Sequence, residues 1–483
     1  MHYQLPFQAI VLVPQFLPIA IQARLQPVSW ASGVYSRSMT NLILQHRPLL
    51  DPNRSRFLCV ITLLIASCAM SQNKPSPEAV YTDQALELVR QNDVKQALDH
   101  ILSLEPRSRA DLIEITQIPA PPFGEGDRAL KFQELLKEAG LNEVTVDEVG
   151  NVIGKRPGTR GNRVVAYSAH LDTVFPLETD LTVRQDGSRL YAPGIGDNSR
   201  GLITILTVLR AMQFAQLKTE ADVWFIGNVG EEGLGDLRGM KHLFREGADR
   251  IHSLIAVDGG SASRIVYGGV GSHRYRVTFA GPGGHSWGAF GLANPHHAIG
   301  RAIALFDEQA LPLTREGPKS SYNVGRLGGG TSVNSIPFEA WMEVDMRSGS
   351  QEKLNQIDAV FQSAIQQALD QENTERETGP ELSLSIERVG TRPAATGDSA
   401  QPIVQRAMAA TKAFGITPDL QISSTDANLP ISKGIPAITM SRGGRGGNSH
   451  SPEEWWENDD GHISIQIGLI TLLTEAGYVA ADP

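Results

Sequence analysis

The stretch Val223-Trp-Phe-Ile-Gly-Asn-Val-Gly-Glu-Glu-Gly233 is the most informative part of this chain. It begins with an apolar run, which is typical of a strand buried on both faces of a parallel sheet. It ends in two adjacent carboxylates, Glu231 and Glu232. Two negative charges at the end of a buried strand are costly unless a group of opposite charge accompanies them. The stretch therefore predicts a buried strand that leads into a charged site.

Other chemically reactive side chains follow apolar runs in the same way. In open α/β sheets, sites assemble beyond the carboxyl ends of the strands. We therefore expect these groups to lie together at one edge of the sheet, although the last of them comes far downstream in the chain. The groups that share this position are His170, Asp172, Asp197, Asp258 and His450.

The order of the predicted elements indicates an α/β fold with a second domain inserted into it. Strands and helices alternate from 164 to 258, which is typical of a mostly parallel central sheet. After Gly271 the order becomes strand, helix, strand, strand, helix, strand, as in a ferredoxin-like α+β unit. The α/β pattern resumes after Pro402. The expected parts are a leader at 1–75, the main domain at 76–272 and 395–483, and the inserted domain at 273–394.

Composition narrows the class of protein and the kind of site. The chain has 483 residues, of which 41% are hydrophobic and 20% charged, as expected of a globular protein. A net charge of −10 argues against nucleic acid as a partner. The 2 cysteines, Cys59 and Cys68, both lie near the N-terminus. A metal site in the folded body must therefore use His, Asp and Glu side chains.

The N-terminal part of the sequence resembles an export signal. Basic residues precede a short apolar run within 54–66, and that run is too short to span a bilayer comfortably. The segment ends in Cys68 within a sequence that resembles a bacterial lipobox, so we expect a periplasmic or lipid-anchored envelope protein. Cleavage after Ala69 is an alternative, and a chance apolar run in a cytoplasmic protein is another. A signal this deep in the chain suggests a start downstream of Met1, for example at Met39.

The acidic and imidazole side chains together supply ligands for two divalent ions. Asp197 would bridge the ions. His170 and Asp258 would complete one set of ligands, and Glu232 and His450 the other. Imidazole nitrogen and carboxylate oxygen suit zinc, cobalt or manganese, and zinc is the ion we expect.

Two carboxylates remain outside these ligand sets. Asp172 lies two residues after His170, so we expect it to accept the imidazole N–H and fix the ring. Glu231 would act as a general base in hydrolysis. Each motif alone has an ordinary explanation, such as a surface ion pair, a turn or a helix cap. Their recurrence at successive strand ends favours a dinuclear metal site.

These motifs resemble those of the co-catalytic zinc exopeptidases and deacylases, which include peptidase T, glutamate carboxypeptidase, succinyl-diaminopimelate desuccinylase and aminoacylase. The resemblance extends from about Leu112 to the end of the chain. It implies a zinc-exopeptidase-like catalytic domain with the ligands and base given above, and an inserted lid and dimerisation domain. The motifs that carry it are His170-Leu-Asp-Thr173, Gly196-Asp-Asn198, Gly230-Glu-Glu-Gly233, Asp258-Gly259, Gly284-His-Ser286 and His450.

The same resemblance assigns roles to lid residues. His285 matches a histidine that often crosses a dimer and stabilises the oxyanion in the partner's site. Asn334 and Arg347 match lid residues that hold substrate, and an arginine fork suits a substrate carboxylate. A loop histidine and an ion pair on a lid strand are the ordinary explanations of His285 and Arg347. The expected assembly is a homodimer formed through the lid.

Asp258 refines the expected activity. In this family an aspartate at that position tends to accompany peptidases, and a glutamate tends to accompany deacylases. We therefore expect a metal-dependent exopeptidase of short peptides that resembles peptidase T or glutamate carboxypeptidase. An N-acyl amino-acid deacylase is the main alternative, and a non-catalytic peptide-binding lipoprotein or a structural surface protein is more remote.

Overall fold

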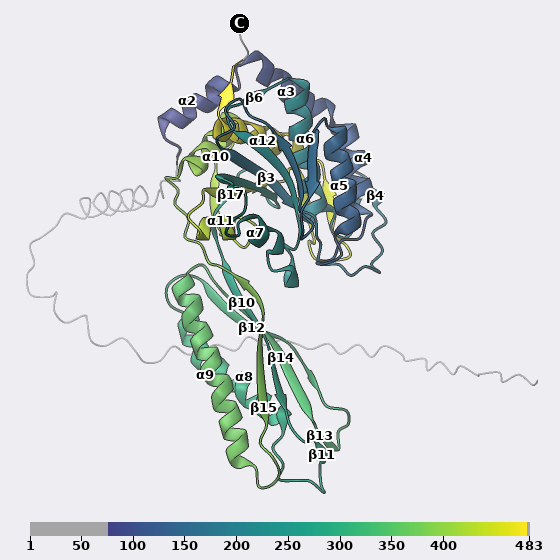
Figure 1. The fold of residues 1–483 in the computed structure, drawn as a ribbon, viewed down its shortest axis with the longest axis vertical. Coiled ribbons are helices and arrows are strands. Elements are labelled where there is room, and N and C mark those ends of the chain that lie inside the picture. The colour runs from purple at the N-terminus through teal and green to yellow at the C-terminus, as the bar shows by residue number, and fades with distance from the viewer. Residues whose placement is uncertain (1–75, 481–483) are drawn as a thin grey trace, which may run out of the picture. The chain divides into compact units, whose positions relative to one another are not determined.

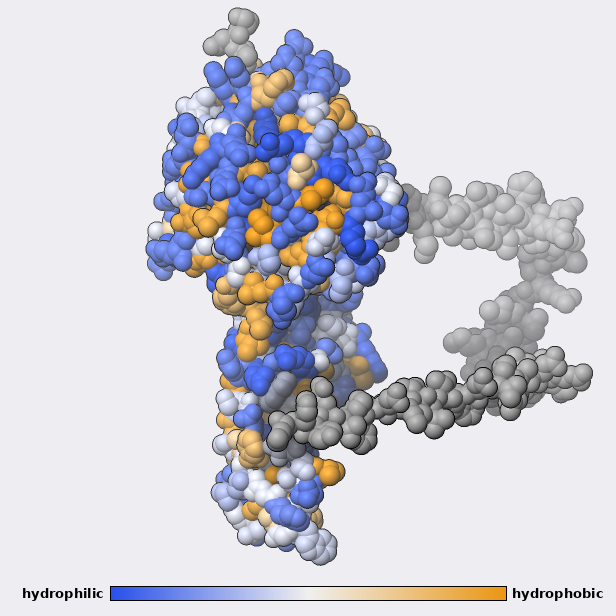
Figure 2. All heavy atoms as spheres, turned by 90° about the vertical axis from the view of Figure 1, so that its right-hand side faces the viewer, coloured by the Kyte–Doolittle hydropathy of each residue, from blue (hydrophilic) through white to orange (hydrophobic). Residues whose placement is uncertain are grey.

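The computed structural model describes residues 76–480. The predicted export signal and Cys68 lie outside this range. Within it, no helix combines the length and the apolar character needed to cross a membrane. The face drawn in Figure 2 is mainly hydrophilic, with hydrophobic residues scattered over it.

An eight-stranded sheet forms the centre of the main domain (Figure 1). Its middle strands β7, β3, β8 and β17 run parallel, as the apolar runs predict. Strands β1 and β2 pair in antiparallel fashion, and β2 continues onto β7. In sheet order the strands are β1 (Glu143–Val146), β2 (Val152–Arg156), β7 (Asp222–Asn228), β3 (Val164–His170), β8 (Ser253–Asp258), β17 (Ala437–Ser441), β9 (Arg264–Gly269) and β16 (Asp419–Ser423).

Alternate residues of each central strand enter two different cores. In β7, Val223 and Phe225 belong to the larger core, while Trp224 and Ile226 belong to the core on the other face. This follows from the two-residue period of a strand. The helices of the main domain are α2 (Ala79–Leu88), α3 (Asn92–Ser103), α4 (Glu105–Thr116), α5 (Gly126–Glu138), α6 (Gly201–Phe214), α7 (Arg238–Leu243), α10 (Pro402–Ala413), α11 (Asn428–Ser432) and α12 (Gly461–Ala476).

The lid has its own sheet and core. Its antiparallel sheet has the order β12-β14-β10-β15, which is the strand order of a ferredoxin-like unit. Two helices pack on this sheet around Phe361, Phe306 and Tyr275 (Figure 1). The lid elements are β10 (Gly271–Ala280), β11 (Gly284–His285), α8 (Pro295–Thr314), β12 (Ser320–Gly329), β13 (Ser335–Ile336), β14 (Glu339–Ser348), α9 (Gln351–Glu375) and β15 (Ser383–Arg392).

A second small sheet of the main domain was not expected from the sequence. Its order is β18-β19-β5-β4, and the loop between β18 and β19 carries His450. Trp456 of β19 is buried and donates its indole N–H to the carbonyl of Gly443, so it is part of the core. The strands are β4 (Arg184–Asp186), β5 (Arg189–Tyr191), β18 (Arg445–Gly447) and β19 (Trp455–Glu457), and the remaining pair is β6 (Lys218–Thr219) with β20 (Tyr478–Val479).

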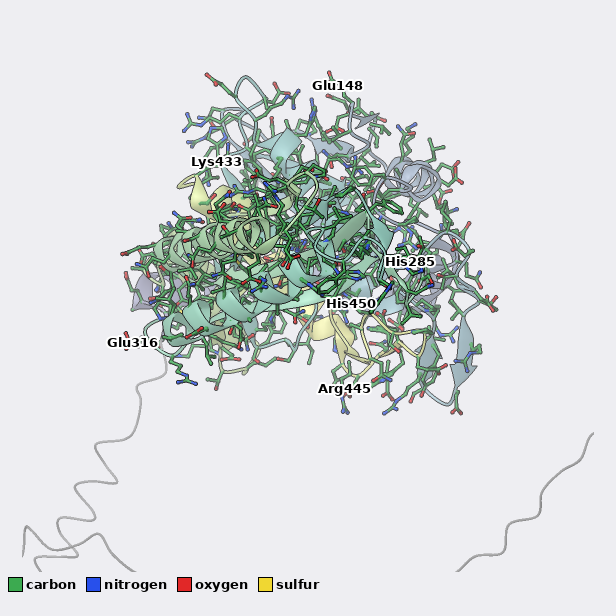
Figure 3. The ribbon with its side chains drawn as sticks, turned by 90° about the horizontal axis from the view of Figure 1, so that it is seen from below. Glu148, His285, Glu316, Lys433, Arg445 and His450 are labelled. Atoms are coloured by element: carbon green, nitrogen blue, oxygen red, sulfur yellow. The ribbon has the colours of Figure 1, made fainter. Side chains whose placement is uncertain are left out.

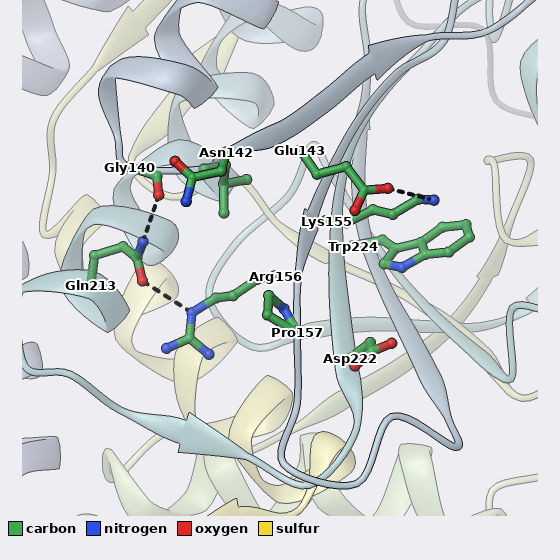
Figure 4. A pocket seen from close by; sticks show the side chains of 10 residues that line it. Gly140, Asn142, Glu143, Lys155, Arg156, Pro157, Gln213, Asp222 and Trp224 are labelled. Carbon is green, nitrogen blue, oxygen red and sulfur yellow. Dashed lines mark hydrogen bonds and ion pairs between the residues drawn. The ribbon is translucent and has the colours of Figure 1, made fainter.

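A cavity of about 620 Å³ lies beside the start of β7 (Figure 4). Asp222 and Trp224 line it together with Lys155, which pairs with Glu143 at 2.9 Å. Asp222 and Trp224 lie at the amino-terminal end of β7, whereas Glu231 follows its carboxyl end. The cavity therefore lies away from the residues that the sequence singles out.

Candidate metal centre

Parallel strands bring the predicted side chains to one edge of the main sheet. His170 is the last residue of β3, and Asp258 is the last residue of β8. Glu231 and Glu232 follow the end of β7 by a short turn. Because these three strands run parallel, their carboxyl ends meet at the same edge.

Two loops complete the cluster. Asp197 lies just before α6, and the peptide bond that follows it is cis. His450 lies in the loop after β18 and has a φ of 64°, an uncommon left-handed conformation for a residue other than glycine. His450 is far from Glu232 in sequence, but the chain brings it back to the same edge of the main sheet, as expected.

Asp197 lies between the two histidines. Its Oδ1 is 3.3 Å from Nε2 of His170, and its Oδ2 is 3.4 Å from Nε2 of His450. The same nitrogen of His450 is 3.0 Å from Oε1 of Glu232. One carboxylate thus presents an oxygen to each of two imidazole rings, which is the arrangement that a bridging ligand requires.

The donor atoms form overlapping sets that suit metal ions. Each set has its donor atoms within 4.8 Å of one another, and Asp197 belongs to two of them. Imidazole nitrogen with carboxylate oxygen is a donor chemistry that zinc and other divalent ions accept. The side chains therefore fit a divalent metal ion. The sets are His170, Asp197 and Asp258; Asp197, Glu232 and His450; and His170, Glu231 and Glu232.

The electrostatics of the cluster also favour a cation. Burial by itself lowers the pKa of His170, but Asp172 and Asp197 outweigh it and hold that pKa well above the usual value. Hydrogen bonds with Asp197 and Glu232 raise the pKa of His450 to about 10. Both rings are thus stabilised in the charged form, because the surrounding carboxylates attract positive charge.

Asp172 lies beside His170 but contacts it differently from the expectation. Nδ1 of His170 is 3.0 Å from the main-chain carbonyl of Asp172 and 3.6 Å from its Oδ1. The longer distance is outside hydrogen-bond range. The carboxylate instead accepts the main-chain N–H groups of Glu231 at 2.9 Å and Glu232 at 2.7 Å. Asp172 therefore fixes the backbone of the two glutamates, because both of its oxygens are directed at that turn.

Glu231 is buried at the same edge, with 6% of its surface exposed. Burial raises its pKa well above the usual value, and the nearby guanidinium of Arg392 opposes that rise. Nη1 of Arg392 is 2.7 Å from Oε1 of Glu231. Arg392 was not expected from the sequence, because it is the last residue of a lid strand and no motif marks it.

Glu454 is a second residue that the sequence did not indicate. Its carboxylate accepts the main-chain N–H groups of Gly194, Gly196 and Asp197 at 2.8, 2.9 and 2.8 Å. Burial raises its pKa to about 7. It holds the turn that presents Asp197. The only signal available in the sequence was an acidic residue shortly after His450.

Asp426 is also buried near this edge of the sheet. It accepts the side-chain N–H of Asn228 at 2.8 Å, and burial raises its pKa to about 6. Asn228 is the last residue of β7. The contact thus lies directly beneath the turn that carries Glu231.

The predicted lid residues fall in two different parts of the lid. His285 and Asn334 are exposed neighbours, because β11 pairs with β13 and the N–H of Ser286 donates to the carbonyl of Asn334. Arg347 lies near the far end of β14 and pairs with Asp345 at 2.7 Å. Figure 3 labels His285 and His450. Among the described residues, the hydrogen bonds of the His285 ring are to its own loop.

The fold and the donor cluster define a metal-dependent hydrolase. The model of peptidase family M20/M25/M40 matches residues 166–474, which is more than half of the chain. The chain therefore belongs to this family and is an enzyme of the metallopeptidase class.

Similar proteins cover most of the chain at low identity. Protein YqjE of Bacillus subtilis (strain 168) is 24% identical over 70% of this chain and 91% of its own. Carboxypeptidase G2 of Pseudomonas sp. (strain RS-16) is 24% identical over 60% of this chain and 68% of its own. The crystal structure of aminopeptidase PepT from Bacillus cereus ATCC 10987 has a TM-score of 0.61 at 21% identity, covering 76% and 98% of the two chains.

Proposed function

We propose that this enzyme is a dinuclear metal-dependent exopeptidase that cleaves short peptides. The observation that carries the proposal is Asp197, whose two oxygens face His170 and His450 and which is shared by two donor sets. A carboxylate in that position can hold two ions side by side. Glu231 adjoins the cluster, and its Oε2 makes no hydrogen bond within residues 76–480, so this carboxylate is the one we assign to proton transfer.

The ligand assignment follows these sets. His170, Asp197 and Asp258 would hold one ion, and Asp197, Glu232 and His450 the other. Zinc is the ion that best suits these donors. When bound, the ions supply Lewis acidity, which polarises a substrate carbonyl and makes water more acidic.

Glu231 carries the proton in the proposed hydrolysis. Its carboxylate accepts a proton from the attacking water and then donates it to the departing amine. Asp172 keeps the main chain of Glu231 and Glu232 in place during this transfer. His285 of the lid would stabilise the oxyanion that forms at the scissile carbonyl.

The substrate is proposed from the site and the relatives together. The relatives named above include an aminopeptidase and a carboxypeptidase, and Asp258 favours peptides over acylated amino acids. Arg347 could bind a substrate carboxylate with its guanidinium fork, and Asn334 could hold the substrate backbone. An N-acyl amino-acid deacylase remains the alternative, because the same metal centre serves both reactions.

A homodimer through the lid explains the position of His285. Arg347 and the start of β14 are eight residues apart, which corresponds to about 25 Å along a strand. His285 lies beyond that start, whereas a tripeptide spans only about 10 Å. A single short substrate therefore cannot contact both residues in one protomer. A second copy that supplies His285 removes this conflict.

The envelope location remains a proposal from the sequence alone. Lipidation at Cys68 would attach the enzyme to a membrane, and cleavage after Ala69 would release it into the periplasm. The mass of the mature N-terminal peptide distinguishes these two outcomes from retention of the whole leader, which would contradict export.

One experiment tests the proposed function. The purified full-length enzyme is stripped of metal, and zinc, cobalt or manganese is added back before di- and tripeptides and N-acyl amino acids are offered. Metal-dependent release of a terminal residue from free peptides supports the proposal and shows which end is cut. Hydrolysis of acylated amino acids alone would move the enzyme to the deacylases. No turnover with metal bound would contradict the proposed activity.

A further inference from the structure

The guanidinium of Arg392 holds Glu231 at two points. Nη1 donates to Oε1 at 2.7 Å, and Nη2 donates to the main-chain carbonyl of the same residue. The Arg392 side chain is itself fixed, because it is 4% exposed and Nη1 also lies 3.0 Å from Oγ of Ser424. A planar guanidinium that binds a carboxylate and its own backbone restricts the rotation of that side chain.

The remaining polar atoms of Glu231 show what this contact leaves free. The N–H of Glu231 donates to Asp172 at 2.9 Å, so three of its polar atoms are engaged. Within residues 76–480, Oε2 of Glu231 has no hydrogen-bond partner, and this oxygen is not completely buried. The two contacts from Arg392 therefore leave one oxygen of the carboxylate available to accept a proton.

Both strands that connect the lid to the main domain reach this segment. Nη1 of Arg274, in the first lid strand, donates to the carbonyl of Gly233 at 2.6 Å. The N–H of Thr391, next to Arg392 in the last lid strand, donates to Oδ1 of Asp236 at 2.7 Å. The segment 231–236 is thus held from the lid at three positions.

We propose that Arg392 is a positioning residue that sets the orientation of Glu231 and links that orientation to the lid. The inference rests on the proposed role of Glu231 as the base. Arg392 acts through Oε1, so that Oε2 faces the reacting water. A lid that shifts relative to the segment 231–236 changes the orientation of the base, because the contact crosses from one domain to the other.

The test replaces Arg392 and compares it with a matched arginine. The variants are Arg392→Ala and Arg392→Lys, which retains charge without the planar fork. Arg388 lies on the same strand and contacts only lid residues, Tyr275 and Asp358, so Arg388→Ala is the control. Each change is also made in a Glu231→Gln background, which removes the carboxylate but not the backbone carbonyl.

The kinetic result separates positioning from substrate binding. Arg392→Ala should lower kcat by about 100-fold with KM within about twofold, because a misplaced base slows the reaction step and not binding. Added guanidinium ion should restore part of that kcat. In the Glu231→Gln background the same change should cost no further activity. A rise in KM at constant kcat, or an equal loss in the Arg388 control, would overturn the proposal.

A second readout does not depend on catalysis. Hydrogen exchange of the peptide that covers 229–237 should be faster in both Arg392 variants than in Arg388→Ala, because the carbonyl contact is lost. Unchanged exchange there would show that Arg392 does not hold the segment. If the wild-type enzyme is inactive on peptides, the proposed function is contradicted. The exchange measurement still decides whether Arg392 holds the segment 231–236, because it does not require activity.

Discussion

Single residues outside the proposed ligand sets hold the loops of the candidate metal centre, and Glu454 is the clearest example. It accepts the N–H groups of Gly194, Gly196 and Asp197. Glu454→Gln replaces one of the two accepting oxygens by an NH2 group, which cannot accept a main-chain N–H, so the three bonds can no longer all form. We expect metal affinity to fall about 10- to 100-fold, measured by competition with a coloured chelator. Glu453→Gln is the control, because Glu453 is exposed. Equal affinity in both variants would exclude this role.

Glu231 gives the second prediction at the scale of a residue. Glu231→Ala should retain its metal, because the two proposed ligand sets do not require Glu231. Turnover should fall about 100- to 10,000-fold, the usual contribution of a general base. Metal content by mass spectrometry and turnover on the best peptide are measured on the same sample. Turnover close to that of the wild type would refute the assignment of the base.

The sequence indicated the ligands but not the residues that hold them. His170, Asp258 and Glu232 follow apolar runs, so their positions at strand ends could be inferred from pattern alone. Arg392 and Glu454 act on main-chain groups of distant loops. Such contacts depend on the path of the backbone, which no local pattern records. The contacts of the Asp172 carboxylate with the main chain of Glu231 and Glu232 were missed for the same reason.

Among the elements, length decided which could be predicted. The order of the lid elements was predicted correctly, because the main strands and helices of the lid are long enough to show a clear period. The strands β4, β5, β18 and β19 have three residues each. That is too short for an alternating pattern to be recognised. The sheet that carries the loop of His450 was therefore missed.

Helix α9 offers a prediction about the lid as an element with its own core. Phe361 is fully buried between Tyr275 and Phe306. Phe361→Ala should lower the free energy of unfolding of the lid by about 3–5 kcal/mol. Calorimetry should show a lower melting temperature for the lid, while the metal content stays unchanged because this core is separate from the main one. The control is Gln366→Ala on the exposed side of α9, and parallel loss of metal would contradict independence of the two cores.

At the scale of the whole molecule, we propose that the two ends of the lid serve different sites. The pair Arg347–Asp345 is connected to the main domain, because Asp345 also binds Arg274, which reaches Gly233. His285 and Asn334 lie in or next to the separate two-stranded sheet of β11 and β13, beyond the other end of the lid sheet. The end with Arg347 can therefore serve the site of its own chain, while the end with His285 is free to serve a second chain. In a dimer with two-fold symmetry, each chain would supply Arg347 to its own site and His285 to the site of its partner.

This arrangement predicts complementation between two inactive variants. His285→Ala should lower kcat with little change in metal content, and Glu231→Ala should be inactive for the reason given above. If His285 acts across the dimer, mixing the two variants forms sites that have Glu231 from one chain and His285 from the other. Random exchange makes half of the dimers mixed, with one intact site in each, so about one quarter of wild-type activity should return. The activity of the mixture is compared with the activity of each variant alone. If the mixture is no more active than the two variants taken separately, His285 does not act in the partner's site.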